Sequence, residues 1–140
     1  MSTRFRVGFC DPESGKVVSI AGHWDGYPSH IGAWLVERHG SLASARELVR
    51  GHKGLYSVRG NRVVDMDRDT RRVDEDIVAF ARKDSDIGEY GYLFAGDSWY
   101  WIDGWKIDEL SGSRTLHRLD AEAVAAGLPD GDAHSTPFHV

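Results

Sequence analysis

The sequence predicts an α+β domain, with an antiparallel sheet of about five strands, two short helices packed on one face and a short C-terminal helix. Three observations support this fold class. Apolar residues alternate along the segment 5–9, two aromatic runs flank Gly96-Asp97, and apolar residues recur at helical spacing between residues 29 and 51. The chain has 140 residues, which suits one domain. We expect this domain to span residues 1–128 and a flexible tail to span residues 129–140.

The first two strands are expected to form a hairpin. The segment 5–9 has the period of two that is typical of a half-buried strand. A turn follows, in which Pro12 suits the second position of a type I turn and Gly15 can adopt a positive φ. The apolar run 17–21 then supplies the second strand of the hairpin.

Two short helices are expected after this hairpin. Ser29 is a good N-cap for a segment that carries Trp34 at helical spacing and ends at Gly40. Ser41 can cap a second helix, in which the apolar residues form one stripe and which ends at Gly51. The two helices would form a helical hairpin or an elbow.

The middle of the chain gives weaker signals. Periodicity is lost from residue 52 to residue 76, so we expect mostly loop, with possible edge strands at 55–58 and 63–64. The apolar run 77–81 is too short for its pattern to distinguish strand from helix, but its β-branched start favours a strand. Near the end of the chain, Asp120 can cap a last helix.

The aromatic hairpin has a register that follows from its turn. Gly96-Asp97 is a two-residue turn with Gly in the first central position, so Ala95 faces Ser98. One face of the hairpin then carries four aromatic side chains, those of Tyr92, Phe94, Trp99 and Trp101. The other face carries Leu93, Tyr100 and Ile102.

This hairpin predicts an uncovered aromatic patch, because a chain this short rarely buries both faces of a sheet. One face would meet the helices, and the other a partner, a second copy or the C-terminal segment. Tyr, Trp and Arg dominate binding hot spots. The expected partner-binding residues are therefore Tyr92, Phe94, Trp99, Trp101, Arg68, Arg71 and Arg72. A self-complementary patch would make a homodimer possible.

Composition limits the possible functions. The net charge of −5 makes direct binding of nucleic acid less favourable. No apolar stretch is long enough to span a membrane, so we expect no membrane association. Cys10 is the single cysteine, which suits a reducing cytoplasm. The sequence has no nucleophile elbow, zinc-protease motif or phosphate loop, so we expect a non-catalytic protein without a cofactor.

An alternative function is nucleotide binding. The helix start after Gly26 would present backbone N–H groups to a phosphate, and Trp24 and Tyr27 could stack on a base. Nearby arginines belong to a basic run, residues 50–62, that contains no acidic residue. The candidate ligand-binding residues are Trp24, Asp25, Gly26, Tyr27, His30, Arg59 and Arg62.

A further alternative is a metal-dependent enzyme that uses His23, Asp25 and His30. Their spacing supplies at most three ligands from one short segment, so hydrogen bonds to the backbone are the favoured role for His23 and Asp25. The segment from Asp65 to Asp76 begins like a calcium loop, but it lacks the required glycine and contains three arginines. We therefore assign no metal site.

The string His23-Trp24-Asp25-Gly26-Tyr27-Pro28, together with the distal aromatic hairpin, resembles a group of short phage and prophage proteins. The resemblance extends roughly from Arg4 to Trp105, apart from the segment 52–76. It implies a counter-defence role in the host bacterial cytoplasm, with a host defence protein as partner. Such proteins include anti-CRISPR proteins, which occlude a Cas complex, and sponges, which sequester a nucleotide signal. The first expectation is thus an anti-CRISPR-like inhibitor, and the second is a sponge.

Overall fold

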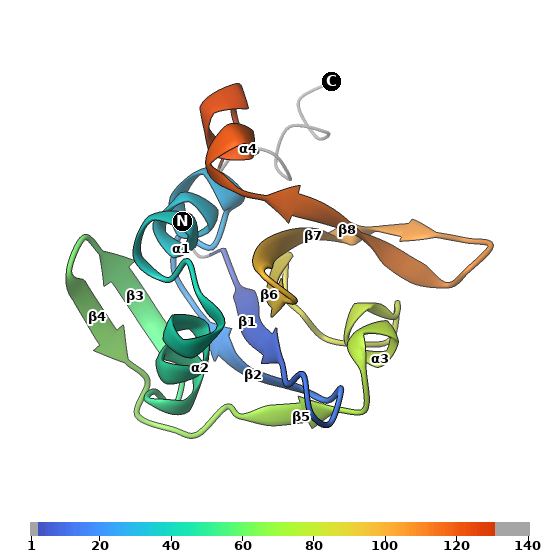
Figure 1. Cartoon of the computed structure of the whole chain (residues 1–140), viewed down its shortest axis with the longest axis horizontal. Helices are drawn as coiled ribbons and strands as arrows, with labels where there is room; N and C mark the ends of the chain where they lie inside the picture. Colours follow the sequence, from blue (N-terminus) through green and yellow to red (C-terminus); the bar gives the residue numbers. More distant parts are fainter. Residues whose placement is uncertain (1–2, 131–140) are drawn as a thin grey trace.

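Helices cover both faces of one mixed β-sheet in the computed structural model, which describes residues 3–130 (Figure 1). In spatial order the strands are β4 (Arg62–Asp65), β3 (Leu55–Arg59), β2 (Val17–Gly22), β1 (Phe5–Cys10), β6 (Tyr90–Ala95), β7 (Ser98–Asp108) and β8 (Ser113–Leu119). A short strand, β5 (Arg72–Asp74), pairs with β2 outside this order.

The α+β class is confirmed, but the prediction of about five antiparallel strands is wrong in detail. The sheet has eight strands, and two of its pairings, β1 with β6 and β2 with β3, are parallel. Alternation of apolar residues identifies a strand but does not identify its neighbours. The central parallel pair joins segments that lie far apart in the sequence.

Both predicted hairpins are confirmed. β1 pairs with β2 through the turn that contains Gly15, which has a φ of 75°. In the second hairpin, Phe94 pairs with Trp99 and Tyr92 with Trp101, which is the register that the turn predicts. Gly96 has a φ of 65°, as a two-residue hairpin turn with Gly in this position requires.

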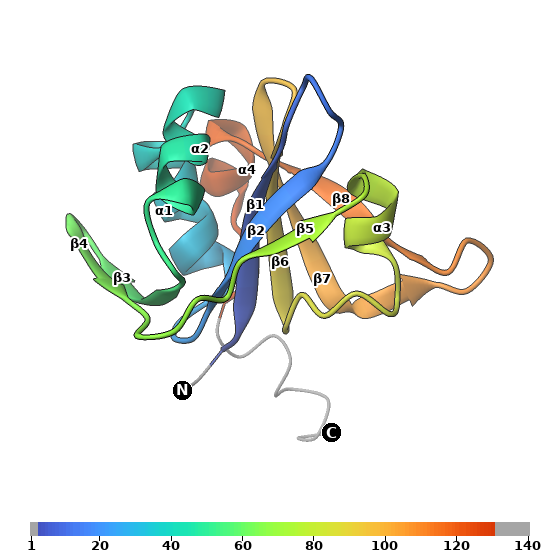
Figure 2. The same cartoon turned by 90° about the horizontal axis from the view of Figure 1, so that it is seen from below.

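Three α-helices lie on one face of the sheet, α1 (Ala33–Arg38), α2 (Leu42–Arg50) and α4 (Ala121–Ala126) (Figure 2). The predicted caps of the last two are confirmed, because the side chains of Ser41 and Asp120 accept hydrogen bonds from the N–H groups of Ser44 and Ala123. Ser29 is not a cap. A π-helical turn, η1 (Pro28–Gly32), precedes α1 and begins one residue earlier, since the fixed φ of Pro28 suits a first helical position.

The segment 77–81 is a helix, α3 (Ile77–Ala81), and not the expected strand. The side chain of Asp76 caps it by accepting a hydrogen bond of 2.8 Å from the N–H of Ala79. The apolar pattern alone does not reveal this cap, which favours a helix over a strand for the segment 77–81. The helix lies on the face of the sheet opposite the other helices and places Phe80 in a cluster with Leu93 and Ile102.

The expected uncovered aromatic patch is wrong, because α1 and α2 cover the face that carries its rings and α3 covers the other face. Tyr92, Phe94 and Trp99 are at most 2% exposed and pack into the core beneath α1 and α2. Trp101 is half-buried and stacks on His117, with ring centroids 4.4 Å apart. The first three rings are therefore core residues that no partner can reach in this fold.

The charged segment 52–76 holds more regular structure than expected. Both predicted strands are present, as β3 and β4, but only β4 is an edge strand, because β3 lies between β4 and β2. β5 was not predicted. Thr70 joins this segment to the sheet, because its hydroxyl accepts a hydrogen bond of 2.8 Å from the N–H of Ala21. Of the predicted tail, 129–140, residues 131–140 lie outside the described part of the chain, and the carbonyl of Pro129 accepts a hydrogen bond from the N–H of Ser29.

Candidate functional site

A cleft of about 370 Å³ opens between the start of β1, the end of β2 and two loops, residues 66–70 and 86–88. We call it the arginine cleft. It is lined by Arg4, Phe5, Arg6, Ala21, Gly22, His23, Met66, Arg68, Asp69, Thr70, Asp86, Ile87 and Gly88. Three arginines and two aspartates thus line a cavity in a protein whose net charge is −5.

Arg6 is the half-buried cation of this cleft. Its Nη1 donates hydrogen bonds to the hydroxyl of Ser19 and the carbonyl of Thr70, both at 3.1 Å. Within residues 3–130, no carboxylate lies at ion-pair distance from it. Burial and, to a smaller extent, the nearby Arg72 guanidinium lower the pKa of Arg6 to about 10, while Asp86 and Asp74 act in the opposite direction. An anion in the cleft would supply the missing counter-charge.

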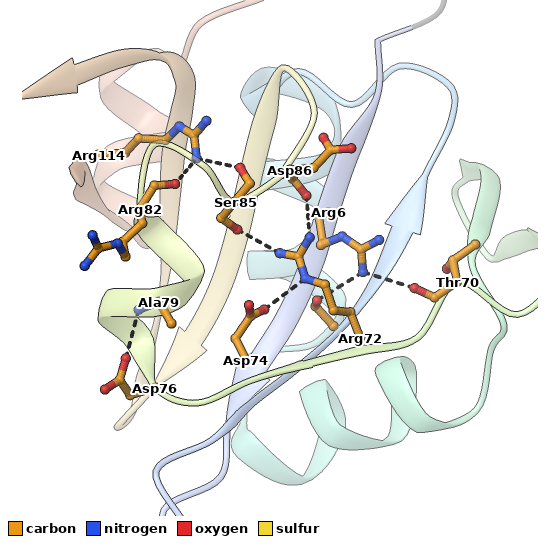
Figure 3. A network of polar contacts seen from close by, with 11 residues as sticks. Arg6, Thr70, Arg72, Asp74, Asp76, Ala79, Arg82, Ser85, Asp86 and Arg114 are labelled. Carbon is orange, nitrogen blue, oxygen red and sulfur yellow. Dashed lines mark hydrogen bonds and ion pairs between the residues drawn. The ribbon is translucent and has the colours of Figure 1, made fainter. Parts of the chain in front are cut away.

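Arg72 lies beside Arg6 but has its partners within the fold (Figure 3). It forms an ion pair with Asp74 at 3.0 Å and donates to the carbonyl of Asp86 and the hydroxyl of Ser85. Its guanidinium also lies over the ring of Phe80, 5.9 Å from the ring centroid. The expectation that Arg72 binds a partner is therefore wrong, because its side chain fixes one wall of the cleft.

Arg114 supports the same wall from β8. It donates to the carbonyls of Arg82 and Ser85, at 2.7 and 2.9 Å, and these two bonds are drawn in Figure 3. It also donates to the carbonyl of Gly104 in β7. Burial lowers its pKa, although three aspartates act in the opposite direction. The loop after α3 is thus fixed to the sheet by two guanidinium groups.

Arg71 and Arg68 have different roles, although both were expected to bind a partner. One nitrogen of Arg71, Nη2, donates to the carbonyls of Val49, Arg50 and His52 at the C-terminal end of α2. This is the helix end at which a cation is favourable. Both arginines are exposed, but Arg71 is bound to the end of α2 and so has a structural role, whereas Arg68 lines the arginine cleft.

Replacement of Arg71 by methionine should lower the free energy of unfolding by about 1 kcal/mol, because the last carbonyls of α2 lose a charged donor. Arg68→Met is the matched control, three residues earlier in the same charged segment, and should change it by less than about 0.5 kcal/mol. Urea denaturation followed by circular dichroism measures both. Equal effects of the two substitutions would contradict the structural role of Arg71.

A second hollow, of about 400 Å³, adjoins the arginine cleft and shares His23, Met66 and Arg68 with it. We call it the ring hollow. Its other lining residues are Tyr56, Val64, Asp65 and Asp67. The ring of Tyr56, which is 44% exposed, stacks on His23 with centroids 5.3 Å apart and planes 14° apart. The ring of Trp24 meets His23 edge-on at 4.9 Å.

Asp65 lines the ring hollow, but one of its oxygens is already occupied. Its Oδ1 accepts hydrogen bonds from the N–H groups of Lys53, Gly54 and Met66. Desolvation would raise the pKa of this carboxyl, yet these bonds outweigh it and lower the pKa below the usual value. Asp65 is therefore ionised and holds the start of β3 against the end of β4.

The helix start after Gly26 does not form the predicted phosphate site. The N–H of Gly26 donates to the carbonyl of Thr3 at 3.0 Å, and its carbonyl accepts from the hydroxyl of Tyr92. The next N–H groups are bound by Pro129 and Tyr27. Thr3 and the segment after α4 therefore occupy the place predicted for an anion, which the local sequence could not indicate.

The other residues predicted to bind a ligand lie apart from the arginine cleft. Asp25, whose φ is 55°, forms an ion pair of 3.2 Å with the exposed Arg59. Tyr27 packs against the core, and Arg62 is exposed at the start of β4. Trp24 lines neither hollow, but its ring contacts those of His23 and Tyr56, which line the ring hollow.

The predicted metal alternative is not supported by the positions of its residues. His23 stacks on Tyr56, Asp25 pairs with Arg59, and Nε2 of His30 lies 2.9 Å from the carbonyl of Val58. Within residues 3–130, no three histidine, cysteine or acidic side chains are placed to hold a metal ion. A contact between a side chain and the backbone, the role expected for His23 and Asp25, is made by His30, whereas Asp25 pairs with the side chain of Arg59.

The sequence did not identify three residues of the two hollows, Arg4, Arg6 and Tyr56. It also missed a hydroxyl–imidazole pair at the α1–α2 junction, where Oγ of Ser44 lies 2.8 Å from Nδ1 of His39. Burial lowers the pKa of His39. The N–H of Ser44 is bound by Ser41 and its hydroxyl lies 3.4 Å from the carbonyl of Arg38, so the pair belongs to the helix junction.

In the described part of the chain, no helix is long and apolar enough to cross a membrane. No protein-family model matches this chain, and no match is found among curated proteins or among solved structures.

Proposed function

We propose that this protein is a non-catalytic binding protein that holds a small ligand by a phosphate or similar anionic group in the arginine cleft. The observation that supports this most is the state of Arg6, a half-buried guanidinium with hydroxyl and carbonyl partners but no ion pair within the described residues. A buried charge is costly unless it is paired, so an incoming anion gains more here than at an exposed arginine.

The surroundings of Arg6 suit an anion. Arg4 and Arg68 are exposed, line the same cleft and can approach a ligand from its rim. A planar guanidinium can donate two parallel hydrogen bonds to a phosphate or carboxylate. The Arg72 side chain does not block Arg6, because its own donors are directed to Asp74, Ser85 and the carbonyl of Asp86.

Calorimetric titration of the full chain with inorganic phosphate and pyrophosphate at low salt tests this proposal. We expect measurable binding that Arg6→Gln weakens at least about tenfold, with Arg68→Gln weakening it less, because each removes a charge-assisted donor. Arg62→Gln is the control, since this arginine is exposed outside the cleft.

If Arg6→Gln lowers the melting temperature, weaker binding by this variant could reflect loss of folding. Arg68→Gln then tests the cleft, because Arg68 is exposed and its replacement should leave the fold intact. Binding that survives both substitutions unchanged would place the anion elsewhere. Failure of phosphate, pyrophosphate and a simple carboxylate such as citrate to bind with a Kd below about 1 mM would overturn the proposal.

A second candidate is the inhibitor of a host defence protein that the phage resemblance implies. The observation that favours it is the hairpin arm, the outer part of β7 and β8, which extends beyond the rest of the fold (Figure 1). Leu110 at its tip is 99% exposed, and Trp105 and Ile107 are 50% and 38% exposed. Exposed aromatic and aliphatic groups on a projecting arm are suited to protein binding.

Affinity capture from host lysate with tagged wild-type protein and with the Trp105→Ala/Leu110→Ala variant tests this second candidate. A host protein retained by the wild type and lost by the double variant would support it. Retention by both proteins, or by neither, would argue against the arm as the docking surface.

A further inference from the structure

We infer that the ligand of the arginine cleft is a nucleotide, whose base stacks on Tyr56 in the ring hollow while its phosphate lies against Arg6. This inference rests on the proposed function and adds the class of ligand. It starts from the adjacency of the two hollows, which share His23, Met66 and Arg68 as common lining. A ligand that fills both can place an anionic group against Arg6 at one end and a ring against Tyr56 at the other.

Tyr56 provides a rigid surface for a planar ring. One side of its ring is covered by His23, in near-parallel contact at 5.3 Å, and the side chain is still 44% exposed. The backbone holds the pair in place, because the carbonyls of Leu55 and Tyr56 accept hydrogen bonds from the N–H groups of His23 and Trp24. Little side-chain entropy is then lost when a base stacks on this surface.

The simplest role for an exposed tyrosine on a strand is to cover the sheet. Tyr56 does more than this, because its ring contacts two other rings. Tyr56 belongs to a set of three rings. The ring of Trp24 lies edge-on to that of Tyr56, with centroids 6.4 Å apart, and the ring of His23 stacks on Tyr56. Tyr56 also lines a hollow of about 400 Å³, within the range of roughly 300–1,000 Å³ that is usual for small-ligand sites. Val73 and Val78 are more exposed and line neither hollow.

The chemistry of the two hollows matches the two ends of a nucleotide. The cleft supplies Arg4, Arg6 and Arg68 for phosphate, and the ring hollow supplies a stacking surface. Stacking on an aromatic side chain tolerates every base, because each has a π-face. Arg68 borders both hollows and can therefore contact the phosphate or lie over the edge of the base.

Calorimetric titration of the full chain with adenosine monophosphate, ribose 5-phosphate and inorganic phosphate separates the two ends of the ligand. We expect adenosine monophosphate to bind at least about tenfold more tightly than ribose 5-phosphate, which lacks the base. Tyr56→Ala should remove this advantage and leave inorganic phosphate unaffected, whereas Tyr56→Phe should retain it. Val78→Ala, another exposed apolar residue outside both hollows, is the control.

The outcomes distinguish this inference from the proposed function. Equal affinities for adenosine monophosphate and ribose 5-phosphate, with Arg6→Gln weakening both, would overturn the nucleotide and leave anion binding intact. Tighter binding of adenosine monophosphate that Tyr56→Ala does not change would place the base elsewhere and also overturn the inference. Absence of binding by all three compounds would overturn the nucleotide, and failure of pyrophosphate and citrate to bind as well would overturn the proposed function itself.

Discussion

Trp99→Ala should lower the free energy of unfolding by about 3–5 kcal/mol, which is the usual cost of removing a large buried aromatic side chain. Trp99 is 2% exposed, and its ring meets that of Phe94 edge-on at 5.3 Å. Its indole N–H donates to the carbonyl of His39, at 2.6 Å, and so joins β7 to the end of α1. Urea denaturation monitored by circular dichroism measures the change.

Two further variants separate the causes of this loss. Trp99→Phe keeps much of the ring but leaves the His39 carbonyl without its donor, so we expect a cost of about 1–3 kcal/mol. Trp105→Ala, on the same strand at 50% exposure, should cost less than about 0.5 kcal/mol. Similar costs for Trp99→Ala and Trp105→Ala would contradict the position of Trp99 in the core.

Phe80→Ala should also cost about 3–5 kcal/mol, because Phe80 is the main apolar contact between α3 and the sheet. Its side chain is fully buried, and α3 has only five residues, too few to be stable without tertiary packing. The substitution would leave a cavity above Leu93 and Ile102 and remove the ring under Arg72. Hydrogen exchange should show loss of protection at the amides of residues 77–89.

Val78→Ala is the matched control for Phe80→Ala, because Val78 lies on the same helix and is 60% exposed. It should leave both the unfolding free energy and the exchange pattern nearly unchanged. If Phe80→Ala proves equally neutral, the segment 77–81 does not cover the sheet as described. Leu93 and Ile102 on the second face would then be accessible after all.

Local chemistry explains what could be predicted from the sequence. The register of β6 and β7 follows from Gly96-Asp97, because a two-residue turn leaves only one alignment of the strands that it joins. The caps Ser41 and Asp120 act on N–H groups three residues away, so a short window is sufficient. The parallel pairing of β1 with β6 has no such local signal.

The candidate site could not be predicted for the same reason. Arg6 contacts the carbonyl of Thr70, and the walls of its cleft come from loops that begin at residues 66 and 86. No spacing in the sequence indicates that these segments meet. The residues chosen from the sequence were instead the densest local groups, and the structure uses Gly26, Arg71 and Arg72 to hold the fold together.

The central position of β1 has a consequence for biosynthesis. Phe5 pairs with Tyr90, so one edge of β1 has no partner until the ribosome has made β6. At a translation rate of ~5–20 residues per second, that edge stays open for several seconds after the first hairpin emerges. An open edge with apolar neighbours is a template for aggregation, and closing so long a loop slows folding. This edge of β1 is therefore exposed to aggregation until β6 has emerged from the ribosome.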